Sequence, residues 1–170
     1  IKKNGEFTVN IALVHKQVPV LGVIYVPVLG EVFYAAKDLG SFKATGIKPQ
    51  SDVKDVQAAG AVLPLAQPER PYTAVASKSH LSPETVEYIE TLKQEHGEVA
   101  TISKGSSLKL CMVAEGVADC YPRFAPTMEW DTAAGSAICK YAGKTVIDWE
   151  TKEEMRYNRE QLLNHWFLVK

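Results

Sequence analysis

Apolar segments and turn residues alternate along the first 44 positions of the chain. The apolar segments are rich in Val, Ile, Phe and Tyr, which favour strands, whereas the intervening HKQVP, PVLG and KDLG contain residues that favour turns. The apolar segments cover residues 7–14, 20–26, 31–36 and 41–44. This pattern predicts four strands joined as an antiparallel meander.

Residues 45–70 have no clear period and contain Pro, Gly, Ala and Gln. Such a composition is typical of a connecting segment. We therefore expect a meander over residues 1–44, which belongs to an amino-terminal domain, then a connector over residues 45–70 and an α/β domain over residues 71–170.

Strand and helix patterns alternate after residue 71. A strand pattern runs to residue 80, and the helix after it begins with Ser82 as N-cap and Pro83 in its first turn and ends at Gly97. Further strands are expected at residues 98–103, 118–121, 144–148 and 166–169, and further helices at residues 106–115 and 130–143. The alternation predicts a mixed sheet, so the fold class is α/β (α+β).

The charge of the chain excludes two broad classes of partner. Its net charge is −1 and its pI is near 6.5, whereas proteins that bind nucleic acids or membrane surfaces carry an excess of Lys and Arg. No apolar run reaches the roughly 18 residues that span a bilayer, and the opening IKKNGE is unlike a signal peptide. We expect a cytoplasmic protein that acts on small molecules or binds other proteins.

The three cysteines, Cys111, Cys120 and Cys139, are odd in number and lack CxxC spacing. Two of them lie in apolar helical patterns. We expect buried free thiols rather than disulfides or zinc ligands.

Two hydroxyls and a lysine lie at the expected start of the helix over residues 106–115. Ser106 and Ser107 are typical helix caps. Lys109 lies three residues beyond Ser106 on the same helix face, so a hydroxyl, backbone N–H groups and an ammonium could converge on one phosphate. The rest of this helix is apolar up to Glu115, so the charge of Lys109 needs a partner or solvent. The cap and the anion site are both open interpretations at this point.

Arg123, Asp131 and His80 are the other candidates. Arg123 follows an expected strand in YPRFAP, where a guanidinium could bind a phosphate, stack on a base or simply lie on the surface. Asp131 is the expected N-cap of the helix over residues 130–143, or alternatively one carboxylate ligand of a metal ion such as Mg²⁺. His80 ends a strand ahead of a helix, where α/β proteins place ligand contacts, although a lone histidine is more often structural.

Four segments closely resemble the inositol monophosphatase superfamily: LGVIYVPVLGEVFYAA, GSSLKLCMVAEGVADCYPRF, WDTAAG and YNREQLLNHWFLV. The W-D-x-A-A-G segment is similar to a metal signature of the superfamily, and G-S-S-L-K with Y-P-R-F is similar to its bacterial 3'(2'),5'-bisphosphate nucleotidases. The resemblance covers essentially the whole chain. It implies the carboxyl-terminal part of the layered fold of sugar phosphatases and inositol monophosphatases.

The resemblance also implies a Mg²⁺-dependent phosphatase that removes the 3'-phosphate of 3'-phosphoadenosine 5'-phosphate, a reaction of sulfur metabolism, and that lithium inhibits. It implies that Asp131 is the catalytic carboxylate and a metal ligand. The substrate-binding residues that it implies are Gly105, Ser106, Lys109, Arg123 and His80. An association with the inner face of the membrane is a further implication for the complete protein.

The superfamily carries further carboxylates, in an E-E motif and a D-P-x-D-G-T motif ahead of the meander, whereas this chain begins at IKKNGEFTV. We therefore expect the carboxyl-terminal portion of a longer enzyme, with weak Mg²⁺ binding and little activity by itself. Such a portion exposes one apolar face of the meander, which predicts a homo-oligomer.

Two alternative functions stay open. An inositol or sugar monophosphatase relative is disfavoured by Lys109 together with Arg123, because a nucleotide with two phosphates needs more cationic contacts than a monophosphate. The other alternative is a non-catalytic nucleotide-binding module that naturally lacks the metal half.

Overall fold

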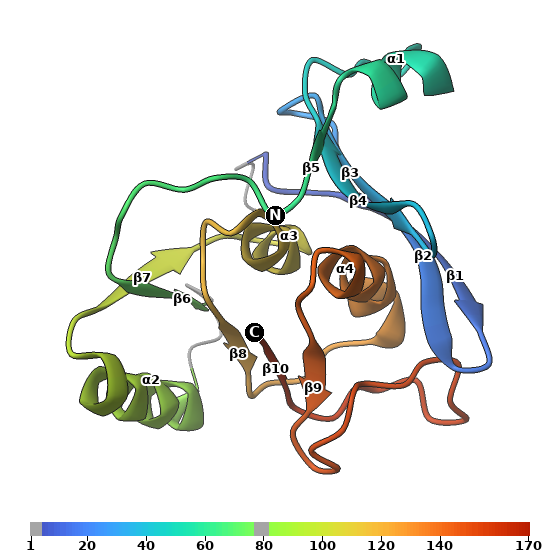
Figure 1. Ribbon diagram of the computed structural model, residues 1–170. Helices are drawn as coiled ribbons and strands as arrows, with labels where there is room; N and C mark the ends of the chain where they lie inside the picture. Colours follow the sequence, from blue (N-terminus) through green and yellow to red (C-terminus); the bar gives the residue numbers. More distant parts are fainter. Residues whose placement is uncertain (1–4, 77–81) are drawn as a thin grey trace.

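The computed structural model describes residues 5–76 and 82–170 as alternating layers of sheet and helix (Figure 1). Helices α3 (Leu108–Glu115) and α4 (Glu129–Tyr141) lie between two sheets, and α2 (Pro83–His96) covers the far face of the second sheet (Figure 1). This arrangement belongs to the α/β (α+β) class, so the fold class expected from the sequence is confirmed.

The first sheet has five antiparallel strands that follow one another in chain order. They are β1 (Val9–His15), β2 (Val18–Val26), β3 (Glu31–Ala36), β4 (Gly40–Ala44) and β5 (Gly60–Val62). The meander of the first four strands is therefore confirmed. Its register pairs Ile11 with Val23 and Val23 with Tyr34, so these three side chains lie on the same face.

Residues 45–70 form more than a connector. Asp52 accepts hydrogen bonds from the N–H groups of Lys54 and Asp55 and begins the short helix α1 (Val53–Ala58). β5 follows directly and pairs with β4. Six helical and three extended residues are too few to produce a readable period, so the sequence did not predict them. The domain boundaries at residues 44 and 70 stay a prediction.

Helix α4 packs closely against both the first sheet and α3. A Cβ at Gly22 of β2 would lie 2.2 Å from the carbonyl oxygen of Ala134. A Cβ at Gly135 of α4 would lie 2.8 Å from the Cβ of Leu110. These two glycines permit the close approach of α4 to β2 and to α3.

The outer face of the first sheet, opposite α4, is apolar. Val9, Ile11 and Leu13 alternate along β1 and are 49%, 60% and 58% exposed. Leu21 lies opposite Leu13 and extends the same face onto β2. The apolar exposure expected of the meander is therefore found on β1, whereas Val32 and Ala44 on the same face are buried together with Ile47.

The second half of the chain contains a mixed sheet. β6 (Tyr72–Ala76) pairs in parallel with β7 (Val99–Ser103), and a parallel bridge joins Ala74 to Cys120, just ahead of β8 (Tyr121–Arg123). β10 (Phe167–Val169) lies between β8 and β9 (Val146–Asp148) and is antiparallel to both. Consequently β6, β7, β8 and β9 all end at one edge of this sheet.

Helix and strand boundaries mostly follow the sequence pattern. Ser82 caps α2 and Gly97 ends it, as predicted. Helix α3 begins only at Leu108, because Ser106 adopts the left-handed conformation with a φ of 51°. The strand expected over residues 118–121 is wrong in position, since Cys120 forms just an isolated bridge and the strand follows it.

Cys111, Cys120 and Cys139 are buried and free, as expected. Burial raises the pKa of the Cys139 thiol to about 12, so this thiol stays protonated. In the described part of the chain no helix is both long and apolar enough to cross a membrane. The cytoplasmic location stays a prediction.

Candidate functional site

The starts of α3 and α4 and the end of β8 surround a cavity of about 350 Å³, which we call the α3–α4 pocket. Its lining includes five residues that the sequence singled out: Ser106, Ser107, Lys109, Arg123 and Asp131. The other lining residues are Leu110, Tyr121, Pro126, Thr127, Thr132 and Phe167. The fold therefore gathers most of the candidate residues in one place.

Lys109 is the buried cation of the α3–α4 pocket. It is 7% exposed, and its Nζ donates to the carbonyl oxygen of Lys104 at 3.2 Å and to that of Ser106 at 2.9 Å. The same Nζ lies 5.5 Å from the centre of the Tyr121 ring, within cation–π range. An ammonium has three N–H donors, so these two carbonyls leave one donor for a bound anion.

The buried charge of Lys109 lowers the stability of the protein when no ligand is bound. Burial and, to a smaller extent, the Arg123 guanidinium lower the pKa of Lys109 from 10.5 to about 8, against the opposing effect of Glu6 and Asp131. An anion placed between the two cations would offset their repulsion. The electrostatics of the pocket therefore favour a negatively charged ligand.

The two serines at the start of α3 do not cap it with their side chains. Ser107 holds the N-cap position but makes no side-chain cap bond. Its Oγ accepts a hydrogen bond from Asn10 Nδ2 at 2.7 Å, and the Oγ of Ser106 lies 2.6 Å from Thr8 Oγ1. The interpretation of these serines as side-chain caps is therefore wrong, because Thr8, just ahead of β1, and Asn10 of β1 contact their hydroxyls. The N–H groups at the start of α3 can instead serve an anion.

Arg123 ends β8 at the mouth of the α3–α4 pocket. One of its terminal nitrogens donates to the carbonyl oxygen of Pro126 at 3.0 Å. Its Nε is buried and has no hydrogen-bond partner among the described residues. A buried donor without a partner costs about 1–3 kcal/mol, so an acceptor on a ligand would be stabilised here.

Asp131 lies in the first turn of α4 and not at its N-cap, so the N-cap prediction is wrong. The helix begins at Glu129 behind Met128, whose N–H donates to the Oδ2 of Asp131 at 2.9 Å. Met128 is extended and bridges to Leu163, which places the start of the helix ahead of Asp131. The carboxylate still favours the helix start through the helix dipole.

The described residues do not by themselves form a magnesium site. Asp131 is exposed at the α3–α4 pocket, and residues 5–76 and 82–170 contain no group of three or more His, Cys, Asp or Glu side chains that could hold a metal. Mg²⁺ prefers six oxygen ligands in near-octahedral geometry. Asp131 could supply one of them.

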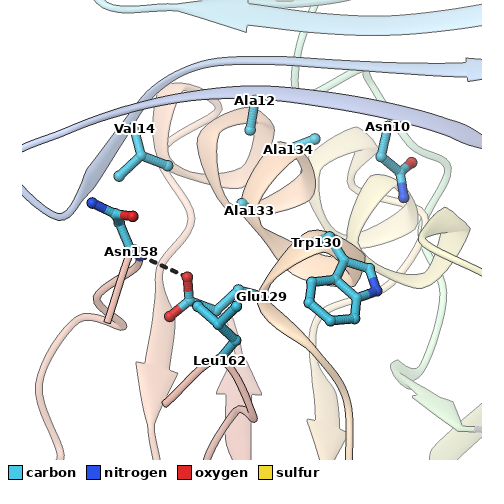
Figure 2. Close-up of a pocket in the computed structure, with 9 residues that line it drawn as sticks. All are labelled: Asn10, Ala12, Val14, Glu129, Trp130, Ala133, Ala134, Asn158 and Leu162. Carbon is cyan, nitrogen blue, oxygen red and sulfur yellow. Dashed lines mark hydrogen bonds between the residues drawn. The ribbon is translucent and has the colours of Figure 1, made fainter. Parts of the chain in front are cut away.

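A second cavity, of about 410 Å³, lies between β1 and α4 (Figure 2). Asn10 and Trp130 lie at one end of it, and Val14 and Asn158 lie at the other (Figure 2). The Glu129 carboxylate in this cavity already accepts three hydrogen bonds from the segment at Asn158, the shortest at 2.6 Å. Because its charge is bound by the protein, this cavity is a weaker candidate than the α3–α4 pocket.

Two of the residues expected to bind substrate lie elsewhere. His80 falls outside the described residues. Gly105 does not line the α3–α4 pocket, and its N–H donates to Glu6 Oε2 at 3.1 Å behind the loop.

Sequence reasoning missed two polar residues, one just ahead of β1 and one in it, that contact residues lining the α3–α4 pocket. Thr8 and Asn10 bind the two serine hydroxyls, and they belong to no motif. The signal that could have found them is alternation, because Glu6, Thr8 and Asn10 are polar at every second position of an otherwise apolar strand.

The sequence pattern of the inositol monophosphatase family matches residues 1–167. The chain belongs to this family. It is 47% identical over 169 residues to the 3'(2'),5'-bisphosphate nucleotidase CysQ of Salmonella typhimurium, and 44% identical over 169 residues to that of Escherichia coli. Both alignments cover 99% of the chain, which spans 62% of the length of these relatives.

Solved structures of the inositol monophosphatase family agree with this assignment. The structure of CysQ from Bacteroides thetaiotaomicron, described as a bacterial member of the family, matches with a TM-score of 0.93 and 54% identity over 99% of this chain and 64% of that one. A staphylococcal IMPase-II matches with a TM-score of 0.72 at 17% identity over 99% of this chain and 60% of that one, which supports the fold alone. The resemblance to the family and to its CysQ members is confirmed.

Proposed function

We propose that the protein to which this chain belongs is a Mg²⁺-dependent phosphatase that removes the 3'-phosphate of 3'-phosphoadenosine 5'-phosphate and releases AMP and phosphate. The observation that carries the proposal is the α3–α4 pocket, in which a buried lysine and an arginine with an unpaired Nε face one space beside the start of a helix. The names of the CysQ relatives support the choice of a nucleotide as substrate.

The described residues suggest a division of roles in the α3–α4 pocket. Lys109 and Arg123 bind phosphate oxygens, and the N–H groups at the start of α3 add neutral donors. Two neighbouring cations suit a ligand with more than one phosphate group. Asp131 is proposed as one ligand of Mg²⁺, and since the described residues supply no further cluster of ligands, we assign no reaction step to the ion.

Phosphate release from 3'-phosphoadenosine 5'-phosphate, with Mg²⁺ and with or without lithium, tests the proposal. We expect activity that lithium inhibits in a protein of the relatives' full length that carries this chain, and little activity in the 170-residue chain alone. Equal activity in both proteins would contradict the proposed metal requirement. Activity in neither would favour the non-catalytic nucleotide-binding module.

The same assay separates the phosphatase alternatives. Inositol 1-phosphate should compete weakly, because a monophosphate offers Lys109 and Arg123 fewer charge-assisted contacts. Asp131→Asn should remove most turnover, whereas Lys109→Ala should mainly raise KM, by an amount that corresponds to about 1–3 kcal/mol. Equal and small effects of both substitutions would contradict these roles.

We also propose that the chain self-associates through the outer face of the first sheet. This face presents Val9, Ile11 and Leu13 on β1, and exposed apolar surface on a strand favours pairing with another chain. Ile11→Lys should shift the sedimentation of the 170-residue chain towards the monomer. An unchanged distribution of species would contradict this interface.

A further inference from the structure

Residues just ahead of β1 and at its start contact the loop before α3 at successive positions. We call Glu6, Thr8 and Asn10 the strand triad, and residues 104–107 the site loop. The members of the strand triad are two positions apart, so they lie on one face of an extended segment. Glu6 binds Gly105, Thr8 contacts Ser106 at 2.6 Å and Ser107 at 3.3 Å, and Asn10 binds Ser107.

The side chain of Glu6 contacts the site loop at the backbone N–H of Gly105. Its Oε2 accepts a hydrogen bond from the N–H of Gly105 at 3.1 Å, and its Oε1 lies 3.9 Å from Lys104 Nζ. A Cβ at Gly105 would lie 2.9 Å from the same Oε2 and 3.1 Å from the Cβ of Glu6. The close contact explains why a glycine suits this position of the site loop.

Thr8 and Asn10 contact the side-chain hydroxyls of the next two residues of the site loop. Thr8 Oγ1 lies 2.6 Å from Ser106 Oγ, and Asn10 Nδ2 donates to Ser107 Oγ at 2.7 Å. Ser106 has a φ of 51°, a left-handed conformation that is uncommon for a residue other than glycine. Such a conformation persists where surrounding contacts determine it, and the contact with Thr8 is one of them.

The site loop in turn holds the cation of the α3–α4 pocket. The carbonyl oxygens of Lys104 and Ser106 both accept hydrogen bonds from Lys109 Nζ. The positions of these carbonyl oxygens depend on the backbone conformation of Ser106, and therefore on its contact with Thr8.

We propose that the strand triad positions the site loop, and through two of its carbonyl groups the ammonium of Lys109, for binding the phosphate of the substrate. These are positioning residues, since none of the three lines the α3–α4 pocket. The identity of the ligand rests on the proposed function, whereas the ordering of the site loop by the strand triad does not.

The test exchanges isosteric side chains at two neighbouring positions, one just ahead of β1 and one at its first residue. Thr8→Val removes the hydroxyl that contacts Ser106, Thr8→Ser retains a hydroxyl, and Val9→Thr adds a hydroxyl on the opposite, exposed face as the matched control. The measurements are amide hydrogen exchange over residues 104–109 without ligand, and KM and kcat for 3'-phosphoadenosine 5'-phosphate in a protein of the relatives' length that carries this chain.

We expect Thr8→Val to speed exchange in the site loop and to raise KM, each by roughly three- to tenfold, the effect of one neutral hydrogen bond. The kcat should stay close to that of the unmodified protein, because the contact affects binding of the ground state and transition state alike. Thr8→Ser and Val9→Thr should leave both measurements unchanged.

Three results would overturn the proposal: unchanged exchange in Thr8→Val, equal effects in Val9→Thr, or loss of kcat without a rise in KM. Ser106→Ala removes the same contact from the side of the loop, so combining it with Thr8→Val should speed exchange no further. Additive effects of the two substitutions would also contradict positioning. If the unmodified protein neither binds nor hydrolyses the nucleotide, the proposed function fails, while the exchange data still decide whether the strand triad orders the loop.

Discussion

Replacing Lys109 with methionine should make the free protein more stable and its ligand binding weaker. Methionine has a similar length and fits an apolar site, but it carries no charge. Lys109 is 7% exposed, and its pKa falls from 10.5 to about 8, mainly through burial. The α3–α4 pocket therefore holds a charge whose burial reduces the stability of the free protein.

The size of the effect follows from the pKa of Lys109. At about 1.4 kcal/mol for each pKa unit, the fall from 10.5 to about 8 corresponds to about 3 kcal/mol. The carbonyl oxygens of Lys104 and Ser106 would each lose a hydrogen-bond partner in the variant, at about 1 kcal/mol apiece, which reduces the gain by about 2 kcal/mol. We expect Lys109→Met to raise the free energy of unfolding by about 1 kcal/mol at pH 7.

The gain should depend on pH in a defined direction. Below pH 8 the lysine is charged in both the folded and the unfolded chain, so the whole cost of burying the charge is present. Between pH 8 and pH 10.5 the folded chain loses this proton first, and the cost declines. Above pH 10.5 the lysine is neutral in both states, so the advantage of the variant disappears.

Urea unfolding at pH 7 and at pH 10.5, followed by circular dichroism, measures this difference. Lys104→Met is the matched control, because the side chain of this neighbouring lysine is 46% exposed and its replacement should change stability by less than about 0.5 kcal/mol. A Lys109→Met protein that is less stable at pH 7, or whose advantage is the same at both pH values, would refute the reasoning.

Three further predictions concern the framework around the site. Gly22→Ala places a Cβ 2.2 Å from a backbone carbonyl oxygen of α4 and should lower the free energy of unfolding by about 3 kcal/mol in a urea titration. Burial alone would raise the pKa of Asp119, but the Arg70 guanidinium and a backbone N–H outweigh burial and lower it. Arg70→Met should therefore cost about 1 kcal/mol at pH 7, and the cost should shrink in titrations below pH 4 as the carboxylate is protonated. Glu129→Ala removes a buried carboxylate that binds Arg159, and its thermal unfolding should show a loss of about 3 kcal/mol.

The meander and the β–α alternation could be predicted because their periods are long enough to read. Ser82, Pro83 and Gly97 marked the ends of α2 by local chemistry alone. The start of α4 could not be predicted in the same way, since it depends on the bridge between Met128 and Leu163, which joins distant parts of the chain. Local signals predict an element, whereas tertiary contacts decide at which residue it begins.

The candidate site shows the same limit. Lys109 was identified from the sequence because a cation in an otherwise apolar helix is conspicuous, and Arg123 because it follows an expected strand. The fold places both at the α3–α4 pocket. The partner of the Ser106 hydroxyl was missed, because Thr8 lies 98 positions away and its alternation with Glu6 and Asn10 does not indicate which loop it contacts. Which residues hold a loop in place is a property of the fold and not of the local sequence.

Calorimetric titration of 3'-phosphoadenosine 5'-phosphate at pH 7, into a protein of the relatives' length that carries this chain, tests the central claim most directly. We expect the bisphosphate to bind more tightly than AMP, and Lys109→Met to remove most of this preference. Equal affinities for the bisphosphate, AMP and inositol 1-phosphate, or a preference that survives in Lys109→Met, would contradict the assignment of the α3–α4 pocket as the nucleotide phosphate site.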